Sequence, residues 1–143
     1  MRVSEAMTRE VRVANPTQSI REVAKIMAEI DAGGVPVGEN DRLVGMITDR
    51  DIALRAVAQG KGPDTPVRDV MSKDVKFCYD DEDLEHVADN MGELQVRRLP
   101  VVNRDKRLVG IVALGDIARS EDHETTGETT AEVSKPGGRH RQK

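Results

Sequence analysis

Aromatic residues and cysteine are almost absent from this chain. Its 143 residues include one Tyr, one Phe, no Trp and one Cys. The core must therefore be built from Val, Ile, Leu, Met and Ala, which suits strands and short helices packed in layers. The single thiol, Cys78, excludes an internal disulfide, and His86, His123 and His140 show no metal-ligand spacing with it or with one another. We expect no structural zinc site.

Long apolar runs and an excess of basic charge are also missing. The longest apolar stretches, such as residues 108–114, have the length of a strand, and neither a signal peptide nor a transmembrane span is visible. The 26 acidic and 22 basic residues are interspersed and leave a formal net charge of −4, so no broad basic surface for nucleic acid is expected. We predict a cytoplasmic protein that binds neither membrane nor nucleic acid.

Signatures of catalysis are missing as well. No Ser/His/Asp set, Cys/His pair or metal-ligand cluster stands out in the sequence. The acidic run at residues 80–83 lacks the ligand spacing of an EF-hand and lies where acids are favoured before a helix. The sequence therefore predicts a protein that is not an enzyme and holds no metal.

The chain contains an internal duplication. It aligns with itself at an offset of 64, and the matched pairs include Val3 with Val67, Met7 with Met71 and Pro36 with Pro100. One extra residue near Lys106 shifts the register by one, after which Asp51 matches Asp116. We assign copy one with its linker to residues 1–62 and copy two to residues 63–120. Residues 121–143 lose the apolar periodicity and are predicted to form a disordered tail.

Each copy is predicted to fold in the order β-α-β-β-α. Short strands are expected at residues 11–13 and 75–77, and each precedes an amphipathic helix. The apolar positions of these two helices are Ile20, Val23, Ala24, Met27 and Ile30 in copy one, and Leu84, Val87, Ala88, Met91 and Leu94 in copy two. Ser19 and Glu22 form a capping box, Asp83 is an N-cap, and Gly33 with Gly34 is expected to end the first helix.

A hairpin and a second helix complete each copy. In copy one the hairpin strands are predicted at residues 35–37 and 43–48, followed by a helix at residues 49–59. A copy of about 55 residues is too small to bury its sheet alone. The two copies should therefore pack sheet to sheet as one pseudo-two-fold body, with clefts at the join.

Two motifs carry a family resemblance. They are the h-P-V strand, at residues 35–37 and 99–101, and a closing G-h-h-[T/S]-x-x-D motif, which reads Gly45 to Asp51 in copy one. With the β-α-β-β-α order, they resemble paired CBS domains, the Bateman module, over residues 1 to about 120. The resemblance implies an α/β (α+β) fold and a stand-alone, non-enzymatic regulatory sensor. Its ligand would be an adenosine compound such as AMP, ADP, ATP or S-adenosylmethionine.

The resemblance also implies where each ligand cleft lies. The Thr48 hydroxyl and the backbone N–H groups at the start of the helix would hold a phosphate, and Asp51 would accept from both ribose hydroxyls. An arginine at the position of Arg98 can reach phosphate in this family, and Tyr79 could stack on a base. Cleft one gathers Thr48, Asp51, Phe77, Cys78, Tyr79, Arg98 and Leu99.

Cleft two is expected to be degenerate. It gathers Val13, Ala14, Asn15, Gly34, Val35, Ala113 and Asp116. Ala113 lacks the hydroxyl of Thr48, and Gly34 stands where copy two has Arg98. The sequence therefore predicts one competent site, with a second that keeps only its ribose carboxylate and an apolar lining.

Other readings of the same residues stay open. Thr48-x-x-Asp51 is also a capping box that stabilises the helix without any ligand. The chain could then be a structural homodimeric scaffold or stress-response protein with vestigial clefts, or an adaptor that acts through its tail. The resemblance implies a C2 homodimer, because paired CBS modules commonly associate through their helices, and the second helix offers a surface at Ile52, Ala53, Ala56 and Val57. The sensor would act on a separate, unidentified protein partner.

Overall fold

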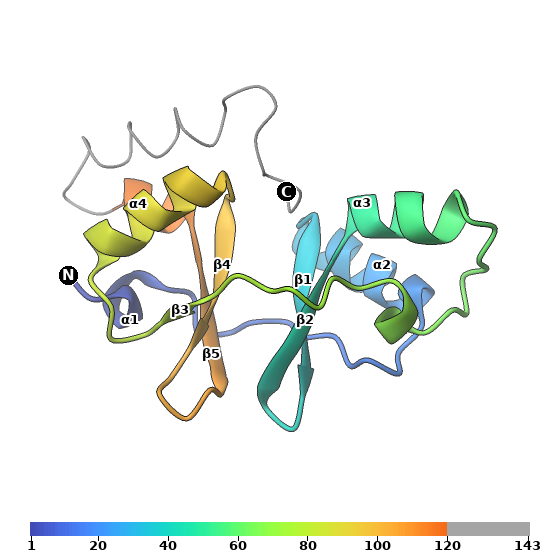
Figure 1. Cartoon of the computed structure of the whole chain (residues 1–143), viewed down its shortest axis with the longest axis horizontal. Coiled ribbons are helices and arrows are strands. Elements are labelled where there is room, and N and C mark those ends of the chain that lie inside the picture. Colours follow the sequence, from blue (N-terminus) through green and yellow to red (C-terminus); the bar gives the residue numbers. More distant parts are fainter. Residues whose placement is uncertain (120–143) are drawn as a thin grey trace. The chain divides into compact units, whose positions relative to one another are not determined.

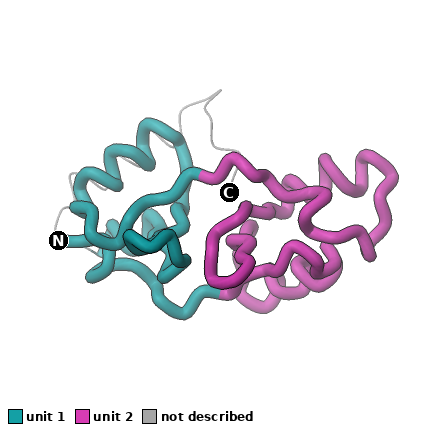
Figure 2. Tube along the Cα trace, turned by 60° about the horizontal axis from the view of Figure 1, so that its bottom comes forward, with its two compact units in different colours: residues 1–11, 76–141, 143 teal, residues 12–75, 142 magenta. Residues whose placement is uncertain are grey.

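Two compact units make up the part of the chain that the structure describes. A computed structural model describes residues 1–119, and the tail predicted at 121–143 lies outside them. Unit 1 comprises Met1–Val11 together with residues 76–119, and unit 2 comprises Arg12–Val75 (Figure 2). No helix among the described residues is long and apolar enough to span a bilayer. The boundaries of the two units in space therefore differ from the boundaries of the repeats in the sequence.

Unit 2 contains most of copy one and the linker that follows it. Its elements are α2 (Ile20–Ile30), β1 (Gly34–Glu39), β2 (Arg42–Thr48), α3 (Asp49–Asp51), the π-helix η1 (Ile52–Val57) and the 3₁₀-helix η2 (Val67–Asp69) (Figure 1). The two strands form an antiparallel sheet. The core of this unit contains Val23, Val35, Ile47 and Val67, which are all fully or almost fully buried.

Unit 1 contains most of copy two and the first segment of the chain. Its elements are α1 (Val3–Ala6), β3 (Cys78–Tyr79), α4 (Leu84–Leu94), β4 (Arg98–Val102), β5 (Leu108–Ala113) and α5 (Leu114–Ala118) (Figure 1). β3 lies parallel to β4, which pairs antiparallel with β5. The two small sheets and their helices confirm the predicted mixed α/β fold class.

The first long helix of each copy forms where its apolar spacing predicts. In α2 the side chain of Ser19 accepts a hydrogen bond of 3.2 Å from the backbone N–H of Glu22, which is the N-cap half of the predicted capping box; the Glu22 carboxylate lies 3.5 Å from the Ser19 hydroxyl instead of accepting from the Ser19 N–H. Ala24 is exposed, and Ile26 is buried with Val23 and Met27. In α4, Leu84, Val87, Ala88 and Met91 are buried as predicted. Asp83 occupies the N-cap position of α4 but makes no side-chain capping bond.

The end of α2 differs from the prediction. Helix α2 ends at Ile30, and Asp31 adopts the left-handed conformation with φ of 53°. The prediction that Gly33 and Gly34 end this helix is wrong, because Asp tolerates the left-handed region well enough to close the helix earlier. Gly34 instead begins β1.

The two hairpins explain the insertion in the repeat. Glu39 pairs with Arg42 across a two-residue turn in which Asn40 and Asp41 both have positive φ, of 54° and 64°. This backbone suits the twist of a tight hairpin. In copy two the N–H of Asn103 donates to the carbonyl of Arg107, and Lys106 takes the positive φ, of 66°. The extra residue of copy two therefore lengthens the turn by one.

The short strands predicted at residues 11–13 and 75–77 are wrong by a few residues. Pairing begins at Ala14, which forms a parallel bridge with Val37, and at Cys78 in β3. Ala14 and Cys78 are buried, whereas Val13 and Phe77 are exposed. The bulky residues favour strand structure by propensity, but the small buried residue after each one sets the register.

The first segment of each copy packs on the hairpin of the other copy, which the sequence did not predict. In unit 1, Thr8 pairs with Ile111 of β5, and in unit 2, Ser72 pairs with Met46 of β2. A Cβ atom on Gly45 would lie 2.7 Å from Met71 Sδ, and one on Gly110 would lie 2.7 Å from Met7 Sδ. These glycines let the methionine and its backbone approach the strand closely.

The second helix of copy one is shorter than the predicted 49–59 and changes type. α3 is followed by the π-turns of η1, which ends at Val57. The predicted surface of Ile52, Ala53, Ala56 and Val57 is partly wrong, because Ala56 is fully buried and Ile52 packs against the core. Leu54 and Val57 are the large apolar side chains that η1 exposes, at 49% and 69%.

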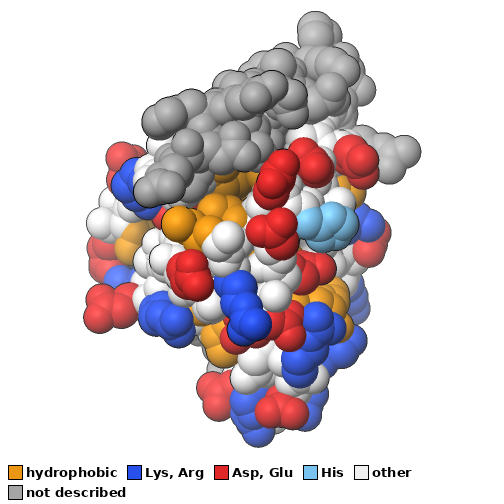
Figure 3. All heavy atoms as spheres, turned by 90° about the vertical axis from the view of Figure 1, so that its left-hand side faces the viewer, with side chains coloured by type: hydrophobic (Ala, Val, Ile, Leu, Met, Phe, Trp, Pro, Cys, Tyr) orange, Lys and Arg blue, Asp and Glu red, His pale blue; other side chains and the backbone are white. Residues whose placement is uncertain are grey.

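Charges of both signs cover the face of unit 1 that carries α1 and α4. Lys and Arg side chains lie among Asp and Glu side chains there, and no large area of one sign is seen (Figure 3). This distribution matches the interspersed charges of the sequence.

Candidate functional site

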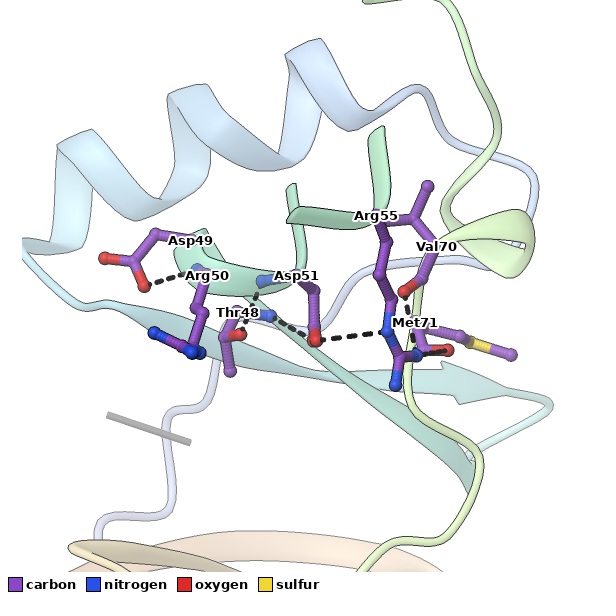
Figure 4. A network of polar contacts seen from close by, with 7 residues as sticks. All are labelled: Thr48, Asp49, Arg50, Asp51, Arg55, Val70 and Met71. Atoms are coloured by element: carbon purple, nitrogen blue, oxygen red, sulfur yellow. Dashed lines mark hydrogen bonds and ion pairs between the residues drawn. The ribbon is translucent and has the colours of Figure 1, made fainter. Parts of the chain in front are cut away.

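Thr48 and Asp51 form a reciprocal capping box at the start of α3. The N–H of Asp51 donates to Thr48 Oγ1, and the N–H of Thr48 donates to Asp51 Oδ2, each at 3.0 Å (Figure 4). Thr48 is 1% exposed, and the Asp51 side chain is 15% exposed. Among the described residues, no acceptor is recorded for the Thr48 hydroxyl proton. The pair is therefore rigid, with one donor left to offer.

The backbone N–H groups around this cap are already occupied. Besides the two capping bonds, the N–H of Asp49 donates to the carbonyl of Gly33 at 2.9 Å, and that of Arg50 donates to Asp49 Oδ1 at 2.8 Å. A phosphate bound by these groups would have to displace the Asp49 carboxylate. Of the groups in unit 2 that were predicted to contact a phosphate, the Thr48 hydroxyl is therefore better placed than the backbone N–H groups.

The second oxygen of the Asp51 carboxylate carries no hydrogen bond within residues 1–119. Asp51 Oδ1 lies 3.9 Å from Nε of Arg55, which is an ion-pair distance but too long for a hydrogen bond. Nη1 of Arg55 donates instead to the carbonyls of Val70 and Met71, at 3.4 Å and 3.3 Å (Figure 4). Asp51 thus combines one fixed oxygen with one that can still accept two hydrogen bonds.

The equivalent position in copy two is built differently. Asp116 Oδ2 accepts a hydrogen bond of 2.7 Å from the N–H of Ala113, but Ala113 has no side-chain oxygen to return one. Asp116 Oδ1 accepts directly from Nη2 of Arg119. The side chain of Asp116 is 5% exposed. Asp116 is therefore more buried than Asp51 and already has a guanidinium partner.

The predicted phosphate residues occupy cross-strand positions within each unit. Gly34 pairs with Thr48 in unit 2, and Arg98 pairs with Ala113 in unit 1. A Cβ atom on Gly34 would lie 3.2 Å from Thr48 Cγ2, so a large side chain at 34 would crowd the threonine. Ala113 has no γ-atoms to crowd Arg98. Each unit therefore has one polar side chain at this pair of positions, Thr48 in unit 2 and Arg98 in unit 1, with a small residue opposite it.

Arg98 is the predicted anion contact of unit 1. Its side chain is half-buried at the start of β4, and the described residues form no hydrogen bond or ion pair with its guanidinium. A planar guanidinium without a carboxylate partner is well suited to phosphate oxygens. This environment favours the predicted role, which stays a prediction.

Tyr79 and Phe77 belong to a cluster at the surface of unit 1. Their rings make an edge-to-face contact with centroids 5.7 Å apart, and the Arg104 guanidinium carbon lies 4.0 Å from the Tyr79 centroid. Arg104 also donates to both oxygens of Asp81, at 2.8 Å and 2.7 Å, which lowers the pKa of that carboxyl and raises the pKa of Arg104. Arg104 therefore covers one face of the Tyr79 ring, and a base could stack only on the opposite face.

Several other predicted ligand residues are core residues. Cys78 and Leu99 lie in the hydrophobic core of unit 1, and Ala14 and Val35 lie in that of unit 2. Val13 is exposed, and Asn15 Oδ1 accepts from the backbone and hydroxyl of Thr17. Burial raises the pKa of the Cys78 thiol to about 12, with added repulsion from Glu82 and Asp80. The thiol is protonated at neutral pH and is no redox or metal-binding candidate.

The structure divides the predicted residues between the two units. Thr48 and Asp51 lie in unit 2, whereas Phe77, Tyr79 and Arg98 lie in unit 1. Each predicted cleft draws on both units, so its assembly stays a prediction. Sequence reasoning missed Arg55 and Arg119, the arginines beside the two carboxylates. The i,i+4 spacing of Asp51 and Arg55 is the signal that could have found the first. No cluster of three or more metal-ligating side chains occurs within the described part.

Comparison with known families identifies the class of protein. The CBS domain family matches residues 3–57 and 67–122, which correspond to the two repeats. The chain therefore belongs to the CBS domain family and contains a pair of these domains.

Individual relatives agree with this assignment. The CBS domain-containing protein YhcV of Bacillus subtilis is 42% identical over 133 residues, which cover 92% of this chain and 94% of YhcV. The CBS domain pair of MJ0100, solved with 5′-methylthioadenosine and S-adenosylmethionine, is 32% identical with a TM-score of 0.71 over 83% of this chain and 94% of that one. PAE2072 from Pyrobaculum aerophilum, solved with AMP, is 28% identical with a TM-score of 0.75 over 92% of this chain and 99% of that one.

Proposed function

We propose that this chain is a non-enzymatic regulatory sensor that binds an adenosine-containing ligand of the AMP, ADP or ATP class. The observation that carries the proposal is the Asp51 carboxylate, which Thr48 fixes through Oδ2 while Oδ1 keeps its hydrogen-bonding capacity. A carboxylate in this state can accept from the two hydroxyls of a ribose. The adenosine ligands in the structures of PAE2072 and of MJ0100 support this assignment.

Thr48 and Arg98 are proposed to select the group attached to the ribose. The Thr48 hydroxyl can donate to a phosphate oxygen, and the guanidinium of Arg98, which makes no hydrogen bond or ion pair with residues 1–119, can pair with its charge. The same guanidinium would repel the sulfonium of S-adenosylmethionine. We therefore propose one competent site, formed as the sequence predicts by Thr48 and Asp51 with Phe77, Cys78, Tyr79, Arg98 and Leu99, and a preference for phosphorylated adenosine.

The second site is proposed to be degenerate. Ala113 offers no hydroxyl, and Asp116 is paired with Arg119. Val13, Ala14 and Val35 would add an apolar lining without a charge. The sensor would act on a separate protein partner, whose identity is open. The cytoplasmic location expected from the sequence stays a prediction.

We also propose that the chain forms a homodimer. The apolar side chains of Leu54 and Val57 project from η1 into solvent, where a second copy could cover them. This proposal holds for the sensor and for the alternative, a homodimeric scaffold with vestigial sites.

Calorimetry with paired amide substitutions tests the ligand proposal. Asp51→Asn keeps an oxygen that can accept from the Thr48 N–H, so the cap survives, but the charge is lost. It should weaken AMP binding at least about tenfold, because one hydrogen bond to a charged group contributes about 1.5–3 kcal/mol. The matched Asp116→Asn should leave the affinity unchanged. AMP at a hundred times its Kd should raise the free energy of unfolding by about 2.7 kcal/mol.

The outcomes separate the sensor from the scaffold. ADP, ATP and S-adenosylmethionine complete the ligand set, with thermal unfolding as a second readout. No heat and no thermal shift with any of them would overturn the sensor and leave the scaffold. Equal affinity of wild type and Asp51→Asn would show that Thr48 and Asp51 serve only as a helix cap.

A further inference from the structure

The two repeat-equivalent carboxylates hold their neighbouring arginines at different distances. In unit 2, Nε of Arg55 is 3.9 Å from Asp51 Oδ1, and no hydrogen bond joins them. In unit 1, Arg119 donates a hydrogen bond to Asp116 Oδ1. The other oxygen of each carboxylate accepts from a backbone N–H in the same way, from Thr48 in one case and Ala113 in the other. The arginine is therefore the main polar difference at the carboxylate itself.

A backbone tether holds Arg55 back from its carboxylate. Its Nη1 donates to the carbonyls of Val70 and Met71, which follow η2 (Figure 4). The next residue, Ser72, exchanges hydrogen bonds of 2.9 Å and 2.8 Å with Met46 of β2. The two carbonyls are thus fixed to the strand that leads into Thr48. The guanidinium of Arg119 makes no hydrogen bond with the described residues other than the one to Asp116.

We infer that Arg55 is a positioning residue, which orients the Asp51 carboxylate while leaving its Oδ1 without a hydrogen bond from Arg55. We infer also that Arg119, by donating to Oδ1 of Asp116, prevents that oxygen from accepting a ribose hydroxyl. This inference deepens the proposed function and depends on it. A ribose can bind Oδ1 of Asp51 without displacing another donor. At Asp116 the same diol must first break a charge-assisted hydrogen bond, which is about twice as strong as a neutral one. The arginines, as well as the missing Thr hydroxyl, thus make the module asymmetric.

The inference predicts opposite effects from removing the two arginines. Arg55→Met should weaken AMP binding about threefold to tenfold, since the carboxylate loses its orienting charge. Arg50→Met is the matched control, because it removes one positive charge from α3 and the exposed Arg50 side chain makes no hydrogen bond or ion pair within residues 1–119. Arg119→Met should remove the guanidinium that donates to Asp116 Oδ1. Adenosine, which carries no phosphate, should then bind at two sites per chain instead of one. Arg97→Met removes an exposed arginine of unit 1 and should leave one binding event.

A double-mutant cycle shows whether Arg55 acts through Asp51. In the Asp51→Asn background, Arg55→Met should have no further effect on the AMP affinity, because there is no carboxylate left to orient. An equal loss in both backgrounds would mean that Arg55 acts on the ligand or on the fold by another route. Circular dichroism and melting curves check that each variant is folded, and Arg55→Lys keeps the charge if the Met variant is not.

Titration of the intact chain with AMP and adenosine, by calorimetry, distinguishes the possible failures. The expected result is weaker AMP binding in Arg55→Met and a second adenosine site in Arg119→Met. If wild type binds AMP once but Arg119→Met still binds adenosine once, or if Arg55→Met matches Arg50→Met, the inference is overturned and the proposed function stands. If neither wild type nor Arg119→Met binds AMP or adenosine, the proposed function is overturned with it.

Discussion

Thr48 and Asp51 show what residue-scale reasoning could reach. Their spacing predicted the capping box, because the bonds that form it are local, and the structure contains both of them. The partners of Arg55 could not be predicted, since they are backbone carbonyls of Val70 and Met71 that the fold brings to the helix. The stacking of Arg104 on Tyr79 could not be predicted either, because the two residues are 25 positions apart in the chain.

Cys78 gives the fold a pH dependence at alkaline pH. The pKa of the thiol is raised from 9.0 to about 12, chiefly by burial, so the unfolded chain ionises first. The stability that the protonated thiol contributes is complete below pH 9 and is lost as the pH rises from 9 towards 12. The free energy of unfolding, relative to Cys78→Ala, should fall by about 1.4 kcal/mol per pH unit in this range. Urea unfolding at pH 8, 9 and 10 measures it, and parallel curves for the two proteins would contradict the burial of the thiol.

At the scale of elements, the hairpins were predictable and the ends of the helices were not. Strands 35–37 and 43–48 were predicted within β1 and β2, because alternating apolar residues flank a turn whose residues tolerate positive φ. The π-turns of η1 have no signature in its sequence, and helix α2 ends at Ile30 with Asp31 as its C-cap although two glycines follow closely. Local propensity fixes which element forms, whereas contacts within the unit fix where it ends.

The exposed face of η1 yields a prediction about assembly. If Leu54 and Val57 form the homodimer surface, Leu54→Glu combined with Val57→Glu should convert the dimer to a monomer, because the burial of four carboxylates would oppose association. Ile30→Glu is the matched control, since Ile30 is an exposed apolar residue on α2 of the same unit. Sedimentation equilibrium gives the mass of each variant. A dimer that persists in the double variant would exclude this surface.

At the scale of the whole molecule, the repeats and the spatial units differ. The duplication predicted domains at residues 1–62 and 63–120, which stays a prediction, whereas the compact units in space group Met1–Val11 with residues 76–119 and keep Arg12–Val75 together. Self-alignment finds which residues are equivalent. It does not show which unit receives the first segment of each copy, because Val3 and Val67 have the same pattern wherever they pack.

Val3 and Val67 provide a matched test of this exchange of segments. Both side chains are fully buried, Val3 in the core of unit 1 and Val67 in the core of unit 2. Truncation to Ala should cost about 2 kcal/mol in either place, through lost contacts and a small cavity. Val3→Ala should raise hydrogen exchange in β4 and β5, which belong to copy two, although residue 3 belongs to copy one in the chain. Val67→Ala should raise exchange in β1 and β2 instead, since it loosens the core that covers that hairpin. Faster exchange of β1 and β2 in Val3→Ala, with β4 and β5 unchanged, would contradict the units and restore the boundaries that the repeats alone suggest.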